Sequence, residues 1–133
     1  MSEVSDRHPW PVYRQFKTME DHSFRSIVRY FEEHRNRINQ LPFNEYFELL
    51  VEYTNALFET GKYHKHLEYS DEIIEWVIHR NINYYKGEDI YRKTLFKKAA
   101  SHYNLHQISK AKHIIREMLK MDPEDSKTRR FLV

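Results

Sequence analysis

Glycine is scarce in this chain, and its scarcity limits the possible folds more than any other feature. Only 2 of the 133 residues are glycine, and they lie far apart, at Gly61 and Gly87. A phosphate-binding loop and a dinucleotide-binding turn each need several glycines in one short run, so the sequence excludes both. Two-residue β-hairpins use glycine to reach positive φ, which argues against a protein of many strands. A helical protein remains.

The composition agrees with one folded helical domain. A length of 133 residues suffices for one core, and an aromatic content of 15% argues against disorder. The absence of cysteine excludes disulfides, thiolate zinc sites and a cysteine nucleophile. The N-terminal sequence is acidic and polar, and no run of 18 apolar residues occurs. We therefore expect a cytoplasmic protein with no membrane segment.

The net charge of +2 is small, but it is unevenly distributed. Residues 42–80 hold 3 Lys and Arg against 8 Asp and Glu, whereas residues 81–133 hold 12 against 6. Solvated helix faces would produce the same distribution. The alternative is a basic surface that attracts an anionic partner. The opposed halves also permit weak head-to-tail self-association.

Apolar residues recur at helical spacing in five long segments. The pattern predicts helices over residues 23–40, 44–60, 63–80, 88–105 and 109–121. Asn44 is the expected N-cap of the second helix, and Gly61 its end. Asp122 and Pro123 are expected to start a short sixth helix, as N-cap and first residue. A helix that short must dock tightly, or the chain must continue in a longer protein.

The expected fold class is all-α, with antiparallel helical hairpins whose turns mostly manage without positive φ. Residues 22–133 are expected to form a single domain. The apolar residues among positions 1–21 do not recur at a regular spacing. Pro9 and Pro11 each bias the residue before them away from helix. We expect an extended arm there, which holds the one strand candidate, residues 10–16. The arm would either dock through apolar side chains or remain a poorly ordered terminus. These side chains are Trp10, Val12, Tyr13 and Phe16.

The last helix pair resembles a tetratricopeptide repeat, most clearly over residues 91–125. In that family a small residue in the first helix faces a small residue in the second, and a proline starts the next repeat. The matching residues here are Leu95, Ala99, His102, Tyr103, Ala111, Ile115, Met118, Asp122 and Pro123. An earlier pair is similar through Leu50, Leu57 and the run Gly61-Lys62-Tyr63. The resemblance implies a short, degenerate array of helical hairpins.

The chain also departs from the family pattern. Thr54 and His66 stand where the family prefers small residues, and the two pairs lie about 45 residues apart instead of about 34. Some members hold a peptide's terminal carboxylate with lysines and asparagines of successive first helices. Asn55 matches one asparagine, but Val51 and Ala100 replace two other clamp residues. That carboxylate clamp is therefore not carried over.

The resemblance implies that a partner segment binds in a groove lined by the first helix of each pair. Lys93 and Lys97 are i,i+4 neighbours on the fourth helix and provide a basic contact. Lys127 and Arg130 would add to this contact if the sixth helix forms. The candidate groove residues are Glu48, Asn55, Lys93, Lys97, Tyr103, Lys127 and Arg130.

Neither a metal site nor a catalytic site is expected, and no cofactor is implied. His102 and His106 have a chelating i,i+4 spacing, but His106 falls in a predicted turn with no acidic third ligand nearby. The glutamates lack the Glu-x-x-His pairs of di-iron bundles. Ser70, Ser101 and Ser109 lack a neighbouring glycine turn that would expose a nucleophile.

The function predicted from the sequence is a non-catalytic protein–protein interaction scaffold. One alternative is a nucleic-acid-binding helical module, with a basic side on the first helix and tyrosines that stack on bases. The overall charge is too low to put this alternative first. The other alternative is a structural domain of a larger chain. The basic side of the first helix comprises Arg25, Arg29, His34, Arg35 and Arg37.

Overall fold

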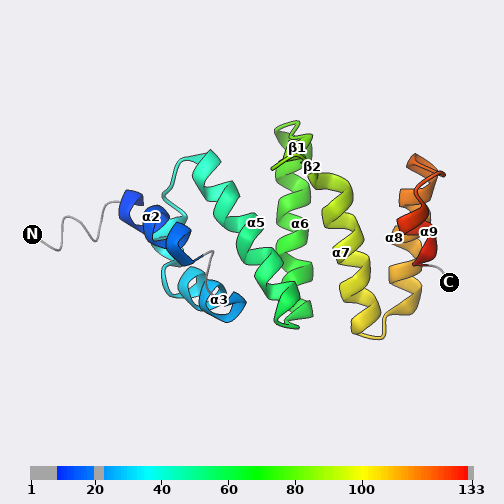
Figure 1. The fold of residues 1–133 in the computed structure, drawn as a ribbon, viewed down its shortest axis with the longest axis horizontal. Coiled ribbons are helices and arrows are strands. Elements are labelled where there is room, and N and C mark those ends of the chain that lie inside the picture. Colours follow the sequence, from blue (N-terminus) through cyan, green and yellow to red (C-terminus); the bar gives the residue numbers. More distant parts are fainter. Residues whose placement is uncertain (1–8, 20–22, 132–133) are drawn as a thin grey trace, which may run out of the picture. The chain divides into compact units, whose positions relative to one another are not determined.

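The computed structural model describes residues 9–19 and 23–131, apart from the side chains of Pro9 and Trp10. Within these residues it contains eight helices and one pair of two-residue strands, so the predicted all-α class is confirmed (Figure 1). The chain divides into two compact units, residues 1–62 and 63–133, which we describe separately.

The first unit holds α2 (Pro9–Met19), α3 (Phe24–Glu33), α4 (Arg35–Ile38) and α5 (Phe43–Glu59). The helix expected over residues 23–40 is interrupted at His34, whose φ of −114° and ψ of 22° are not helical. The imidazole of His34 stacks on the ring of Tyr30 at a centroid distance of 4.0 Å. Its Nδ1 lies 2.9 Å from the Tyr30 carbonyl oxygen, so local contacts hold the chain at the break.

The expected extended arm is wrong for residues 9–19, which form α2 and pack on α3, α4 and α5. Proline is tolerated in the first turn of a helix because the N–H groups there have no intrahelical partner. Val12 and Phe16, one turn apart, are both fully buried. Their burial supplies the tertiary stabilisation that a short helix needs. Residues 1–8, 20 and 21 of the expected arm, and the side chain of Trp10, lie outside the described residues.

Helices α3 and α5 form the core of the first unit. The rings of Phe31 and Tyr53 stack at a centroid distance of 4.0 Å and an interplanar angle of 5°. Three leucines of α5 are fully buried with them, Leu49, Leu50 and Leu57. The expected N-cap at Asn44 is wrong, because α5 begins at Phe43 with Pro42 in the cap position. Proline has no N–H to satisfy, and its carbonyl accepts from the Tyr46 N–H at 2.9 Å.

The second unit holds α6 (Tyr63–His79), α7 (Ile90–Asn104), α8 (Ile108–Met121) and α9 (Ser126–Arg130). Helix α7 packs on α6 and on α8, and successive helices run in opposite directions (Figure 1). The core includes Ala99, Ile115 and Met118, all essentially inaccessible to solvent. Ala111 is buried as well, so both small residues of the predicted pair lie inside the unit.

The segment between the helices predicted at residues 63–80 and 88–105 contributes to a small hairpin, in which β1 (Tyr84–Tyr85) pairs antiparallel with β2 (Glu88–Asp89). Its two turn residues both have positive φ, 50° at Lys86 and 79° at Gly87, as two-residue hairpins require. The strand candidate at residues 10–16 is wrong, because these residues lie in α2. Asn81 and His106 also have positive φ, which contradicts the prediction that the turns mostly avoid it.

We predict that Phe16→Ala lowers the free energy of unfolding by about 3 to 5 kcal/mol, because it removes a fully buried ring and leaves a cavity. The lost contacts include the T-shaped packing against the Tyr30 ring, at a centroid distance of 6.1 Å. Urea denaturation followed by circular dichroism measures the change. Thr18→Ala, on the exposed side of the same helix, is the control and should stay within about 0.5 kcal/mol of the parent. Equal effects of the two substitutions would contradict the burial of α2.

Candidate functional site

In the first unit, Glu48 of the expected groove binds α2. The Tyr13 hydroxyl donates to Glu48 Oε1 at 2.7 Å, and the Lys17 ammonium binds Glu48 Oε2. The hydrogen bond to this carboxylate is the main cause that raises the pKa of Tyr13. Asn55, also on α5, is partly buried. Glu48 therefore holds two helices together, a role that sequence spacing did not reveal.

In the second unit, two of the expected groove lysines lie one turn apart on α7, beside Glu88 of the hairpin. The Lys93 ammonium lies 2.8 Å from Glu88 Oε2. This hydrogen bond and charge lower the pKa of Glu88, and the charges of Lys97 and Lys127 lower it further. Three ammonium groups from two helices thus act on one carboxylate. We call Lys93, Lys97 and Lys127 the lysine cluster.

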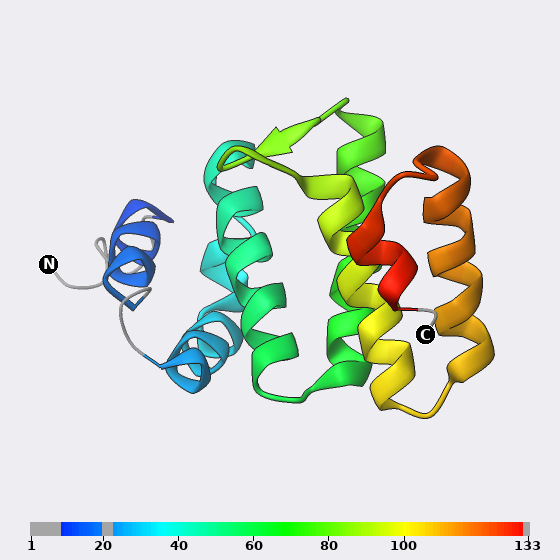
Figure 2. The same cartoon turned by 45° about the vertical axis from the view of Figure 1, so that its right-hand side comes forward.

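Helix α9 brings the third lysine of this cluster to α7. Its end packs on α7 through Phe131, whose ring meets the rings of Phe96 and Tyr103 edge to face at centroid distances of 5.6 and 5.8 Å. The Lys127 ammonium lies 5.0 Å from the centre of the Phe96 ring. Figure 2 shows α9 alongside α7 and α8. The short sixth helix therefore forms and docks, with Arg130 exposed on its surface.

The start of α9 lies three residues later than expected. The N-cap is Asp125, whereas Asp122 occupies the C-cap position of α8 and Pro123 lies in the turn between the helices. The Asp125 carboxylate accepts from the N–H and hydroxyl of Thr128 at 3.1 and 2.6 Å, and from Arg92 Nη2 at 2.5 Å. Its hydrogen bonds, with Thr128 first, lower the pKa of Asp125 to about 2. This carboxylate thus caps α9 and ties it to α7.

We predict that Asp125→Ala frays α9, at a cost of about 1 to 2 kcal/mol, because the helix loses its cap and its ion pair with Arg92. Amide hydrogen exchange at Thr128 and Arg129 measures the local opening. Asp122→Ala is the matched control, since the Asp122 carboxylate accepts from the Glu124 N–H at 3.3 Å and lies 4.0 Å from Arg92. Faster exchange in Asp122→Ala than in Asp125→Ala would contradict this assignment of the cap.

A buried polar group joins α6 to α7. His66 is 2% exposed, with Nδ1 2.7 Å from the Ser101 hydroxyl oxygen and Nε2 3.3 Å from that of Ser70. Ser70 lies one turn along α6, a spacing visible in the sequence, but only the fold brings Ser101 to the ring. Both hydroxyls are fully buried, so a substrate could reach neither without separation of the helices. The group therefore serves the packing of α6 on α7.

Burial, with a smaller contribution from the charge of Lys97, lowers the pKa of His66 from 6.5 to about 4. Between these values the unfolded chain binds a proton that the folded chain does not. The free energy of unfolding therefore falls as the pH falls from about 6.5 to about 4. The loss attributable to His66 is about 3 kcal/mol.

We predict that His66→Phe removes this part of the pH dependence, because phenylalanine cannot take up a proton. Urea denaturation at several pH values between about 4 and 7 measures it. His113→Gln, at an exposed position on α8, should keep the slope of the parent chain. A parent slope that persists in His66→Phe would show that His66 is not its source.

His102 and His106 are not part of a group of described side chains that could hold a metal ion. The Nδ1 atom of His102 lies 2.6 Å from Gln107 Oε1, and His106 lies in the turn with a φ of 62°. Among residues 9–19 and 23–131, no three side chains of the types His, Asp and Glu are grouped so that they could hold an ion. His64 is exposed whereas His66 is buried, so the two face different sides of α6.

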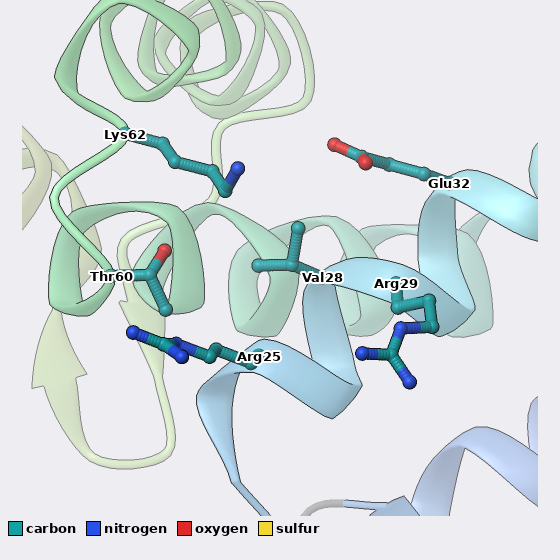
Figure 3. A pocket seen from close by; sticks show the side chains of 6 residues that line it. All are labelled: Arg25, Val28, Arg29, Glu32, Thr60 and Lys62. Carbon is teal, nitrogen blue, oxygen red and sulfur yellow. The ribbon is translucent and has the colours of Figure 1, made fainter.

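The first unit also contains a polar pocket of about 450 Å³. Its wall carries three cationic side chains, Arg25 and Arg29 of α3 and Lys62 after α5. Val28, Glu32 and Thr60 complete the lining (Figure 3). Sequence reasoning placed the two arginines on a basic helix side but did not find the pocket, because Thr60 and Lys62 reach α3 only through the packing of α3 on α5.

Comparison with protein-family models, with curated proteins and with solved structures found no match to this chain. Among the described residues, no helix combines the length and the apolar character that crossing a membrane requires.

Proposed function

We propose that this protein is a non-catalytic cytoplasmic scaffold that captures an acidic segment of a partner protein at the lysine cluster. The observation that carries the proposal is the ion pair of Lys93 with Glu88 at 2.8 Å, a carboxylate on which the charges of Lys97 and Lys127 also act. The cluster combines side chains of α7 and α9, two helices that pack on each other. A carboxylate already binds the Lys93 ammonium in the folded chain, so this position suits an acidic ligand.

We also propose that the α7–α8 hairpin is a degenerate tetratricopeptide-like unit, with α9 in the place of the next repeat's first helix. The sequence pattern over residues 91–125 supports this, together with the burial of Ala99 and Ala111. In such an array, partner segments lie against first helices, here α7. The lysine cluster occupies part of that face, and Phe131 of α9 covers Phe96 of the same helix.

Capture is expected to be weak and sensitive to salt. An exposed ion pair contributes at most about 1 kcal/mol, and salt screens it. An incoming carboxylate must also compete with Glu88 for Lys93, an ammonium that is about half exposed. Several acidic residues in one segment would engage the three lysines together.

We predict that Lys93→Glu combined with Lys97→Glu weakens binding of an acidic peptide roughly tenfold or more, because like charges then face each other. Glu88→Gln should tighten binding a few-fold, since it removes the competing carboxylate. Fluorescence anisotropy with a labelled, aspartate- and glutamate-rich peptide at about 50 mM salt measures both changes. Circular dichroism confirms that each variant folds.

Lys110→Glu combined with Lys112→Glu is the matched control, because it makes the same change in net charge at exposed positions on α8. It should bind the peptide nearly as well as the parent chain. Equal losses in both double variants would show a general charge effect and overturn the assignment to the lysine cluster. Tight binding of single-stranded RNA with a steep salt dependence, without peptide binding, would favour the nucleic-acid alternative.

A further inference from the structure

The polar pocket of the first unit lies away from the lysine cluster in the sequence and has its own chemistry. Its cations come from two places that the fold brings together. Arg25 and Arg29 are i,i+4 neighbours on α3, so their side chains leave the same side of that helix. Lys62 follows the end of α5, and Figure 3 shows its ammonium reaching into the space that Glu32 faces from the opposite side.

The end of α5 sets the position of Lys62. Gly61 has a φ of 76°, which reverses the chain just after the helix. The Gly61 N–H then donates to the Phe58 carbonyl at 3.1 Å, and the Lys62 N–H to the Leu57 carbonyl at 2.9 Å. These two bonds form a Schellman motif. The backbone that carries Lys62 is therefore held by hydrogen bonds and does not hang from a loose loop.

The three cations have no partner of their own in the described part of the chain. Neither Arg25, Arg29 nor Lys62 forms an ion pair or a side-chain hydrogen bond with another described residue. Glu32, the one acid in the pocket wall, accepts instead from the Tyr53 hydroxyl at 2.7 Å. The Thr60 hydroxyl donates to the Ala56 carbonyl at 2.8 Å. Val28, which is 4% exposed, adds an apolar surface between the polar groups.

We propose that this pocket binds a phosphate monoester. Three cations and one carboxylate leave an excess of two positive charges, which matches the −1.5 to −2 charge of a monoester near pH 7. The guanidinium fork of arginine fits phosphate oxygens in pairs, and lysine adds a point charge. A single carboxylate would neutralise only half of the excess. The volume of about 450 Å³ exceeds that of a phosphate group and leaves room for the group that carries it.

Isothermal titration of the full chain with phenyl phosphate and with a phosphoserine heptapeptide tests the proposal at low salt. We expect Arg25→Gln combined with Arg29→Gln to weaken binding roughly tenfold or more, and Lys62→Gln to weaken it less. Lys110→Gln combined with Lys112→Gln removes the same charge elsewhere and should leave the affinity nearly unchanged. Glu32→Gln should tighten binding, since the amide oxygen can still accept from Tyr53 while the negative charge is lost.

Two further measurements identify the ligand. Affinity should fall as the pH drops below about 6, where the monoester becomes a monoanion. If the phosphopeptide binds much more tightly than phenyl phosphate, the ester is carried by a protein, and similar affinities indicate a small phosphate ester. The proposal is overturned if acetate or the unphosphorylated peptide binds equally well, or if the pocket and control variants lose affinity alike. The absence of phosphate binding to the parent chain also overturns it.

Discussion

The packing of α7 between α6 and α8 is the constraint on which the second unit depends. Because neighbours cover α7 on two sides, the side chains on those sides must be small or have their hydrogen-bonding groups paired. Ala99 lets α8 approach, with Ile115 and Met118 in the same core, and Ser101 meets the ring of His66 on the side of α6. The ion pair of Lys98 with Asp71, at 2.7 Å, joins the same two helices at the surface. A large side chain at either small position would push a neighbour away.

This packing also decides which groups are available for binding. With α7 in place, Arg92 meets the cap carboxylate of α9, and Phe96 meets Phe131. These contacts hold Lys127 near the lysines of α7, so a surface of three cations results from the docking of one five-residue helix. In the first unit, too, the packing of helices determines where the binding groups lie. The stacking of Phe31 on Tyr53 packs α3 on α5, and Glu32 of the pocket wall accepts from the Tyr53 hydroxyl.

The sequence predicted the structure correctly where the structure depends on the spacing of residues along the chain. The five long apolar stripes predicted helices, and four of them lie within a few residues of the observed ends. It failed where a tertiary contact overrides a local bias. Pro9 and Pro11 suggested an extended arm, but the first turn of a helix accepts proline and the burial of Phe16 stabilises α2. Either Asp122 or Asp125 could cap a helix, but Asp125 accepts from the Thr128 N–H and binds Arg92 at 2.5 Å, whereas Asp122 lies 4.0 Å from Arg92.

The sequence by itself determined the all-α class, most helix positions and the basic character of residues 81–133, because periodicity and charge are properties of neighbours along the chain. It also identified Lys93, Lys97 and Lys127 as candidates. Only the tertiary structure decided which of them share a carboxylate, that His66 meets Ser101, and that Lys62 joins Arg25 and Arg29 around one pocket. The contact of His66 with Ser101, the approach of Lys62 to the two arginines and the position of Lys127 near Glu88 join residues about 30 or more positions apart, where local spacing carries no information.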